Sequence, residues 1–122
     1  MTFIDPSGAQ IRALAESDID GPIVMLNLLR FAPDDGAERY ARYMEAATPH
    51  LERVGGKLWF LGNAVATVIG TEEWDEVLLL EYPSREAFLE MIADPDYPSD
   101  LRAAALVDSR LICCKARNDG LA

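Results

Sequence analysis

The sequence predicts an α+β domain in which helices cover a four-stranded antiparallel sheet. Two segments, residues 21–31 and 76–82, are apolar at nearly every position, which is typical of strands buried on both faces. Two others, residues 37–54 and 84–92, carry apolar side chains at helical spacing. The order strand, helix, strand, strand, helix, strand most simply gives a ferredoxin-like βαββαβ sheet of order 4-1-3-2, which places the two most apolar strands in the centre.

The chain has 122 residues, enough for one domain that buries about two-thirds of its unfolded surface. We expect a single domain over residues 1–122, with residues 1–20 as an N-terminal appendage and residues 21–117 as the core. Eleven basic and twenty-one acidic residues give a formal net charge of −10, which disfavours nucleic acid and membrane surfaces as partners. No apolar stretch reaches the roughly 18 residues of a membrane span, and the first residues lack a signal-peptide pattern, so we expect a cytoplasmic protein.

Polar residues interrupt the first predicted strand on both of its faces. Because side chains alternate along a strand, Asn27 shares a face with Leu29, and Arg30 shares the opposite face with Leu28. A buried amide without partners costs on the order of 1–3 kcal/mol. Asn27 therefore either ties down a neighbouring loop or helix end, or donates into a pocket where it orients a substrate carbonyl. For Arg30 we expect an ion pair across the sheet with Glu81, the alternative being an end that reaches water.

A short helix is predicted at residues 9–16, and a longer one at residues 37–54. Pro49 lies inside the longer helix and removes a backbone hydrogen bond, at a cost of about 3 kcal/mol. We therefore expect a kink near Thr48 or a division into two segments. Residues 58–70 are predicted to form the second strand, with a bulge or bend at Gly62-Asn63. The inner stripe of the longer helix comprises Tyr40, Tyr43, Met44, Ala47, Leu51 and Val54.

The last part of the chain supplies one further helical turn and the fourth strand. Residues 101–106 are predicted to be helical, and residues 110–117 to be extended. Cys113 and Cys114 are adjacent in that strand, a spacing that fits neither a redox or zinc motif nor an easily closed disulfide. We therefore expect both cysteines to be reduced packing residues, as suits a reducing compartment.

The two central strands are apolar on both faces, although the helices of this fold cover only one face of the sheet. The uncovered face would meet water in a single copy of the chain. Large exposed apolar surfaces usually mark association sites, and most soluble oligomers are symmetric assemblies of one chain. We therefore expect a homodimer formed sheet against sheet.

Five stretches of the chain occur in the order found in one known family: PIVMLNLLRF, the pair Tyr40 and Tyr43, WDEVLLLEYPS, DPDYP and RAAALVDSRLI. Through them the chain resembles, over roughly residues 21–115, the family catalogued as domain of unknown function 1330, within the dimeric α+β barrel superfamily. The resemblance implies the same fold and a homodimer whose sheets form a barrel-like interior with a small pocket beside each sheet. The superfamily includes cofactor-free monooxygenases, muconolactone isomerases, haem-degrading enzymes and stress-response proteins, so the resemblance implies an architecture and no particular reaction.

Six residues are candidates for lining such a pocket: Asn27, Tyr43, Trp59, Trp74, Tyr97 and Arg102. The first-strand motif of the resembled family carries an Asn at the position of Asn27, which favours the pocket role. Arg102 follows the loop that holds Tyr97, and together they could close the pocket and bind an anionic substrate. The alternatives are a surface position for Arg102, a core position for Tyr43, and dimer contacts for the two tryptophans.

No residue can be assigned a catalytic role from the sequence, and the candidates are Asn27 and Asp75. Asn27 would stabilise an oxyanion, whereas Asp75 would need burial to act as a general base. His50 is the single histidine, which excludes a multi-histidine metal site. The acidic residues between 72 and 76 are typical of a solvated turn, and the chain contains no phosphate-binding loop, serine-hydrolase elbow or zinc-protease motif. We therefore expect neither a metal nor a tightly held cofactor.

Two functions follow from the sequence, from different classes. The first is a dimeric barrel that binds a small organic or keto acid, with a cofactor-independent proton transfer or oxygenation as its reaction if it is an enzyme. The second is a non-catalytic binding or assembly module in which Asn27 and Arg30 serve packing alone. The sequence does not decide whether the protein is an enzyme.

Overall fold

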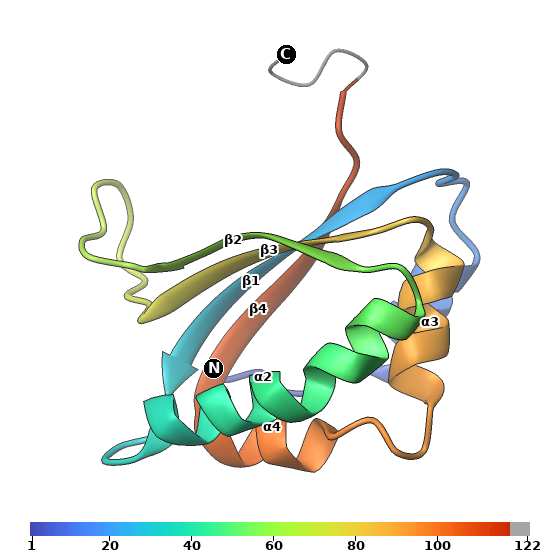
Figure 1. Cartoon of the computed structure of the whole chain (residues 1–122). Helices are drawn as coiled ribbons and strands as arrows, with labels where there is room; N and C mark the ends of the chain where they lie inside the picture. The colour runs from blue at the N-terminus through green and yellow to red at the C-terminus, as the bar shows by residue number, and fades with distance from the viewer. Residues whose placement is uncertain (118–122) are drawn as a thin grey trace.

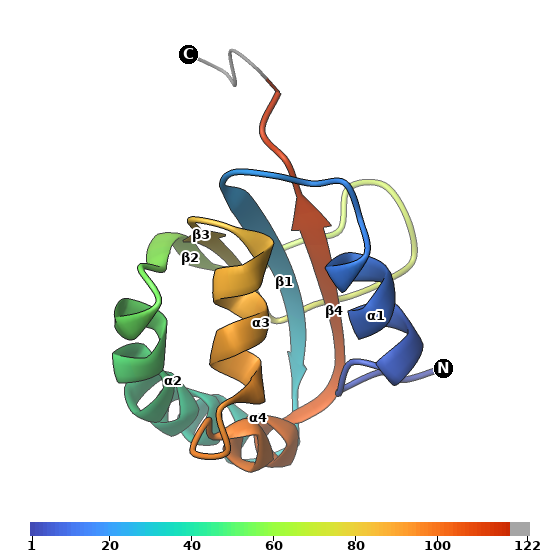
Figure 2. The same ribbon diagram turned by 90° about the vertical axis from the view of Figure 1, so that its right-hand side faces the viewer.

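The computed structural model describes residues 1–117, which form four helices and one four-stranded sheet. Helices α2, α3 and α4 lie on one side of the sheet (Figure 1), and α1 lies beside α3 on that same side (Figure 2). In chain order the elements are α1 (Gly8–Ala15), β1 (Ile23–Phe31), α2 (Gly36–Arg53), β2 (Lys57–Asn63), β3 (Glu76–Tyr82), α3 (Arg85–Ala93), α4 (Ser99–Ala105) and β4 (Leu106–Cys114).

The sheet has the strand order β2-β3-β1-β4, and all three neighbouring pairs are antiparallel. This is the predicted order 4-1-3-2 read from the other edge, so the ferredoxin-like α+β fold is confirmed. The apolar strands β1 and β3 are central. In their register Leu26 lies opposite Leu79 of β3 and Ile112 of β4, which places hydrocarbon next to hydrocarbon across the middle of the sheet.

The two faces of the sheet differ in what covers them. On the face toward the helices, Ile23, Leu29 and Leu78 are completely buried and form the core with the inner residues of α2 and α3. On the opposite face, which we call the open face, no helix of the described residues lies over the sheet (Figure 1). Its apolar side chains on the two central strands are only half-buried: Val24, Leu26, Leu28, Val77 and Leu79.

The second strand is shorter than predicted. It ends at Asn63, which lies opposite Glu76, the first residue of β3. Residues 64–70 are β-prone in composition but have no partner strand beyond that point, so they form an exposed loop in which Val65 and Ile69 are each more than nine-tenths exposed. The bulge or bend predicted at Gly62-Asn63 lies at another place. The register of β2 with β3 shifts between Leu58 and Phe60.

Of the two alternatives predicted for the helix that contains Pro49, the division into two segments is wrong. Helix α2 runs through Pro49 as one element to Arg53 and is not divided into two segments. Its buried stripe, which includes Tyr40, Tyr43 and Ala47, packs without interruption, and this packing outweighs the missing backbone bond at the proline.

The last strand, the two cysteines and the lengths of the helices also bear on the sequence predictions. Strand β4 begins at Leu106, four residues earlier than predicted, directly after α4. Cys113 and Cys114 are both partly buried and are not joined in a disulfide. Within residues 1–117, no helix combines the length and apolar character needed to cross a membrane.

Candidate functional site

A cavity of about 280 Å³ lies between the helix-covered face of the sheet, the helices α2, α3 and α4, and the N-terminal segment around Asp5 and Pro6. Four of the six residues predicted to line a pocket lie in its wall. The wall also contains Tyr40 and Tyr82, which the sequence did not single out for this role. The four predicted residues that the structure brings together here are Asn27, Tyr43, Tyr97 and Arg102.

Asn27 occupies the middle of β1 and points toward the helices. Its neighbours across the sheet are Leu78 and Leu111, and only 5% of its surface is exposed. Within residues 1–117 its side chain makes one hydrogen bond, in which Nδ2 donates to the Met25 carbonyl over 3.5 Å. A long bond of this kind is weak. The amide therefore keeps most of its hydrogen-bonding capacity for whatever enters the cavity.

Three tyrosines form a connected aromatic wall. The rings of Tyr40 and Tyr43 on α2 have centroids 5.1 Å apart, and Tyr43 meets Tyr97 edge to face at 6.1 Å. The hydroxyls of Tyr43 and Tyr97 are hydrogen-bonded to each other. Tyr97 comes from the loop between α3 and α4, where its N–H donates to the Asp94 carbonyl at 3.0 Å. The pair thus couples a rigid helix to a connecting loop at the cavity wall.

Arg102 on α4 brings a positive charge to the same wall. Its Nη1 donates to the Ile4 carbonyl at 2.7 Å, which ties the N-terminal segment over the cavity. No carboxylate of residues 1–117 lies within ion-pair distance of its guanidinium. Asp5 also lines the cavity but is exposed at its rim. The charge of Arg102 is therefore available to an anionic ligand.

The tyrosines of the cavity are held in the neutral phenol form. Burial is the largest cause and raises the pKa of Tyr40, Tyr43, Tyr82 and Tyr97 above the usual value of 10.0. The charge of Arg102 opposes this increase at three of them without cancelling it. At neutral pH these hydroxyls are therefore hydrogen-bond donors to a ligand and not phenolates.

These pKa shifts predict an alkaline titration that can be measured directly, because the chain has four tyrosines and all four are affected. In the folded protein we expect much less phenolate absorbance at pH 10 than in the chain unfolded in denaturant, in which the tyrosines are half ionised. Since the folded state then binds more protons than the unfolded state, the free energy of unfolding falls above about pH 10, by at most roughly 1.4 kcal/mol per tyrosine for each pH unit until the folded-state pKa is reached. If the tyrosines of the native protein titrate near pH 10, as they do in the unfolded chain, they are not buried in a cavity wall.

The other predicted pocket residues lie outside this cavity. Trp59 is on the edge strand β2 with 56% of its surface exposed. Trp74 lies on the loop before β3, with the guanidinium groups of Arg30 and Arg110 at 5.2 Å and 4.9 Å from its ring. Asp75 is exposed, and its carboxylate accepts a hydrogen bond from the Phe31 N–H at 2.8 Å. Asp75 therefore holds the loop against β1, which is the role of an ordinary turn carboxylate.

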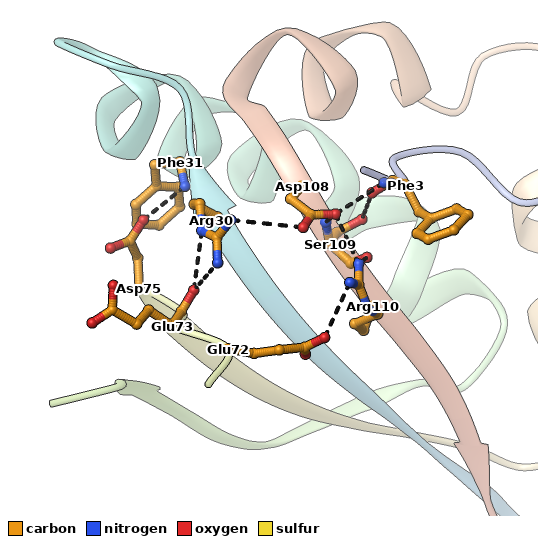
Figure 3. A network of polar contacts seen from close by, with 9 residues as sticks. All are labelled: Phe3, Arg30, Phe31, Glu72, Glu73, Asp75, Asp108, Ser109 and Arg110. Atoms are coloured by element: carbon orange, nitrogen blue, oxygen red, sulfur yellow. Dashed lines mark hydrogen bonds and ion pairs between the residues drawn. The ribbon is translucent and has the colours of Figure 1, made fainter. Parts of the chain in front are cut away.

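A polar network beside Trp74 joins the N-terminal segment to the ends of β1 and β4 (Figure 3). Asp108 is at its centre with 4% of its surface exposed. Its Oδ1 accepts from the Phe3 N–H at 2.9 Å and from Arg110 at 2.8 Å, and its Oδ2 lies 3.8 Å from Arg30. Arg30 also donates to the Glu73 carbonyl. This cluster fastens three distant segments and lines no part of the cavity that holds Asn27.

The predicted ion pair between Arg30 and Glu81 is wrong. Antiparallel pairing places Arg30 opposite Asp108 at one end of the sheet, whereas Glu81 lies opposite Val24 at the other end.

Burial by itself would raise the pKa of Asp108, but the hydrogen bonds from Phe3, Arg110 and Ser109 together outweigh it and hold that pKa below the usual value.

His50 and the acidic turn do not form a metal site. His50 packs edge-on against Tyr97 at 5.8 Å, and its Nδ1 lies 3.5 Å from the Asp94 carboxylate. The acidic residues 72 and 73 take part in the network beside Trp74. Among residues 1–117, no three His, Cys, Asp or Glu side chains are close enough together to hold a metal ion.

Comparison with known proteins places the chain in a family. Residues 33–113 match the family model described as a domain of unknown function (DUF1330), and the chain belongs to this family. The crystal structure of the methylated RPA0582 protein is 41% identical to it, with a TM-score of 0.90 over 98% of each chain. No curated protein matches the sequence.

Two further solved structures extend the comparison. The RPA0582 protein of unknown function from Rhodopseudomonas palustris is 42% identical, with a TM-score of 0.88 over 97% of this chain and 99% of that one. A dabb family protein with a ferredoxin-like fold from Mesorhizobium loti is 13% identical, with a TM-score of 0.59 over 80% of this chain and 99% of that one. At this low identity the second likeness shows the fold alone.

Proposed function

We propose that the protein binds a small organic acid in the cavity beside Asn27. The observation that carries this proposal is that two polar groups with spare hydrogen-bonding capacity line the same cavity. The buried Asn27 amide has a single long hydrogen bond, and the Arg102 guanidinium has no carboxylate partner within residues 1–117. An anion that also offers a carbonyl or hydroxyl oxygen satisfies both groups.

In this proposal each part of the wall has a chemical role. Arg102 holds the carboxylate, and Asn27 donates to a neighbouring oxygen such as a 2-keto group. The neutral hydroxyls of Tyr43 and Tyr97 complete the hydrogen bonds of the ligand, and their mutual bond offers a route for a proton between ligand and loop. Such a route fits a proton transfer that needs no cofactor, so a keto acid with an enolisable carbon is the substrate class of a catalytic version.

A specific observation favours binding without catalysis. The four tyrosines are held neutral by burial, and the candidate base Asp75 lies on the loop before β3, away from the cavity. The cavity wall therefore supplies donors and a positive charge, but its carboxylate, Asp5, lies at the exposed rim. A non-catalytic binding module is thus the alternative function.

The binding proposal predicts separate effects for two substitutions. Wild-type protein is titrated with pyruvate, phenylpyruvate and benzoate by calorimetry, with Arg42→Met on the exposed side of α2 as the matched control. We expect Arg102→Met to weaken binding by about 10- to 100-fold, the loss of a charged hydrogen bond of about 1.5–3 kcal/mol. We expect Asn27→Ala to weaken the binding of keto acids more than the binding of benzoate. The free energy of unfolding should change by less than about 1 kcal/mol, because the hydrogen bond from Asn27 to the Met25 carbonyl is long.

The contrary outcome is equally defined. If none of the three acids binds to the wild type, and Asn27→Ala unfolds at markedly lower denaturant concentration, Asn27 serves packing and the binding proposal is wrong. If the acids bind and no exchange of the carbon-bound proton of pyruvate with deuterated water is detected by NMR, the non-catalytic module is supported over the proton-transfer enzyme.

We also propose that the protein is a cytoplasmic homodimer joined through the open face. The half-buried apolar residues of β1 and β3 on this face, together with the exposed Phe60 and Ile112 beside them, form a surface that a single chain leaves uncovered. Two free cysteines suit a reducing compartment. Each copy keeps its own cavity in this arrangement, because the cavity lies on the helix-covered face.

A further inference from the structure

A second, larger cavity adjoins the first. Its volume is about 450 Å³, and it lies between α1, the N-terminal segment and strand β4. The two cavities have wall residues in common, among them Met25, Phe88, Arg102 and Leu111. They therefore meet along this shared wall, beneath the segment that Arg102 ties down through the Ile4 carbonyl.

The two cavities differ in chemistry. The first contains the Asn27 amide and the tyrosine hydroxyls. Beyond the shared wall, the second cavity is lined mainly by apolar side chains such as Leu14 and Ile112, with Cys113 and the polar residues Gln10 and Ser109 beside them. Its charged side chain on β4, Arg110, is already paired with Asp108 and Glu72. One end of the combined space thus offers an unpaired positive charge and hydrogen-bond donors, and the other end offers a mainly apolar surface with no unpaired charge.

We propose that the two cavities form one site for a carboxylic acid with an extended aliphatic chain. The carboxylate binds Arg102 and the donors of the first cavity, and the alkyl chain of the ligand runs along the shared wall of Met25 and Phe88 into the space beside Leu14. This inference rests on the proposed function, because it uses the same Arg102 anchor, and it adds the substrate class. A compact acid would leave the apolar space to solvent, whereas an alkyl chain removes that surface from water.

The test is a homologous series of straight-chain carboxylates, from acetate to decanoate, titrated into the full-length protein by calorimetry below their micelle concentrations. We expect affinity to increase about fourfold for each methylene that enters the apolar space, the ratio that corresponds to about 0.8 kcal/mol per buried methylene. The increase stops when the space is filled. Alkylammonium ions of the same length are the control for charge, and we expect them to bind more weakly than the acids.

Two variants test where the alkyl chain of the ligand lies. Leu14→Trp, on a helix that has no fully buried residue, fills the second cavity, and Cys113→Phe fills it from the opposite wall. We expect both to abolish the dependence on chain length while acetate and pyruvate bind as they do to the wild type. Binding of the short acids also shows that each variant is folded. The matched control is Ala41→Trp on the exposed side of α2, for which we expect the wild-type series.

Each outcome separates the two proposals. If short acids bind but affinity does not increase with chain length, or increases equally in Leu14→Trp, the bipartite site is wrong and the proposed function stands. If no acid of any length binds, both are wrong. If alkylammonium ions bind as tightly as the acids, the second cavity is a nonspecific apolar surface and Arg102 is not the anchor.

Discussion

Replacement of Leu79 by lysine is expected to convert the proposed homodimer into a folded monomer. Leu79 lies on the open face in the middle of β3, between Leu26 of β1 and Phe60 of β2. In a symmetric interface each substitution occurs twice, so two unpaired charges are desolvated in one contact. A cost of about 4 kcal/mol per dimer corresponds to a roughly 1,000-fold increase of the dissociation constant, measured by sedimentation equilibrium.

The neighbouring positions provide the controls. Ala41→Lys adds the same charge to the exposed side of α2 and is expected to leave the association constant unchanged. Phe60→Ser on the open face is a milder variant, expected to weaken association without adding a charge. Circular dichroism shows that each variant is folded. A wild-type protein that sediments as a monomer at micromolar concentration, or a Leu79→Lys variant that associates as tightly as the wild type, would exclude the open face as the interface.

Replacement of Asp108 by alanine is expected to destabilise the fold by about 3 kcal/mol. The substitution leaves the Phe3 N–H and the Arg110 guanidinium without their common acceptor at 2.9 Å and 2.8 Å, at a site that is nearly fully buried. Loss of one partner from a buried charged network costs more than the network contributed, because the remaining groups stay desolvated. The measurement is urea unfolding in the Leu79→Lys background, where changes in association do not enter.

Two comparisons make this result specific. Glu38→Ala removes an exposed ion pair with Arg42 whose side chains are 4.0 Å apart, and its expected cost is below about 0.5 kcal/mol. The pKa of Asp108 lies below its usual value of 3.8, so its contribution is present at neutral pH and is lost as the pH falls through the folded-state value. An Asp108→Ala variant as stable as the wild type would show that the network of Figure 3 does not hold the N-terminal segment.

Much of the fold could be predicted from the sequence, because the order of the elements and the apolar character of the two central strands leave few arrangements. The end of β2 could not, since residues 64–70 are β-prone and only the first residue of β3 decides where pairing stops. The position of Arg30 relative to Glu81, by contrast, follows from the topology alone. In an antiparallel pair the end of β1 lies beside the start of β3, which excludes Glu81 near the end of β3.

The candidate site was predictable in part. Strand alternation separated Asn27 from Arg30, but which face the helices cover depends on tertiary packing. Tyr40 and Tyr82 were not singled out because their apolar rings suit a core equally well, although buried phenols usually keep a polar partner near the hydroxyl. For the two tryptophans the sequence indicates an aromatic cavity by residue type alone, and their burial is set by loop and edge positions that the sequence does not specify.

Binding of an organic acid beside Asn27 can be observed in an NMR titration of the labelled protein with phenylpyruvate, which follows the side-chain amide of Asn27 and the guanidinium of Arg102. We predict that both signals shift together and saturate at one ligand per chain, and that the signals of Trp59 and Trp74 do not move. If the Asn27 and Arg102 signals stay unchanged through the titration, the cavity does not bind this organic acid and the proposed function is wrong.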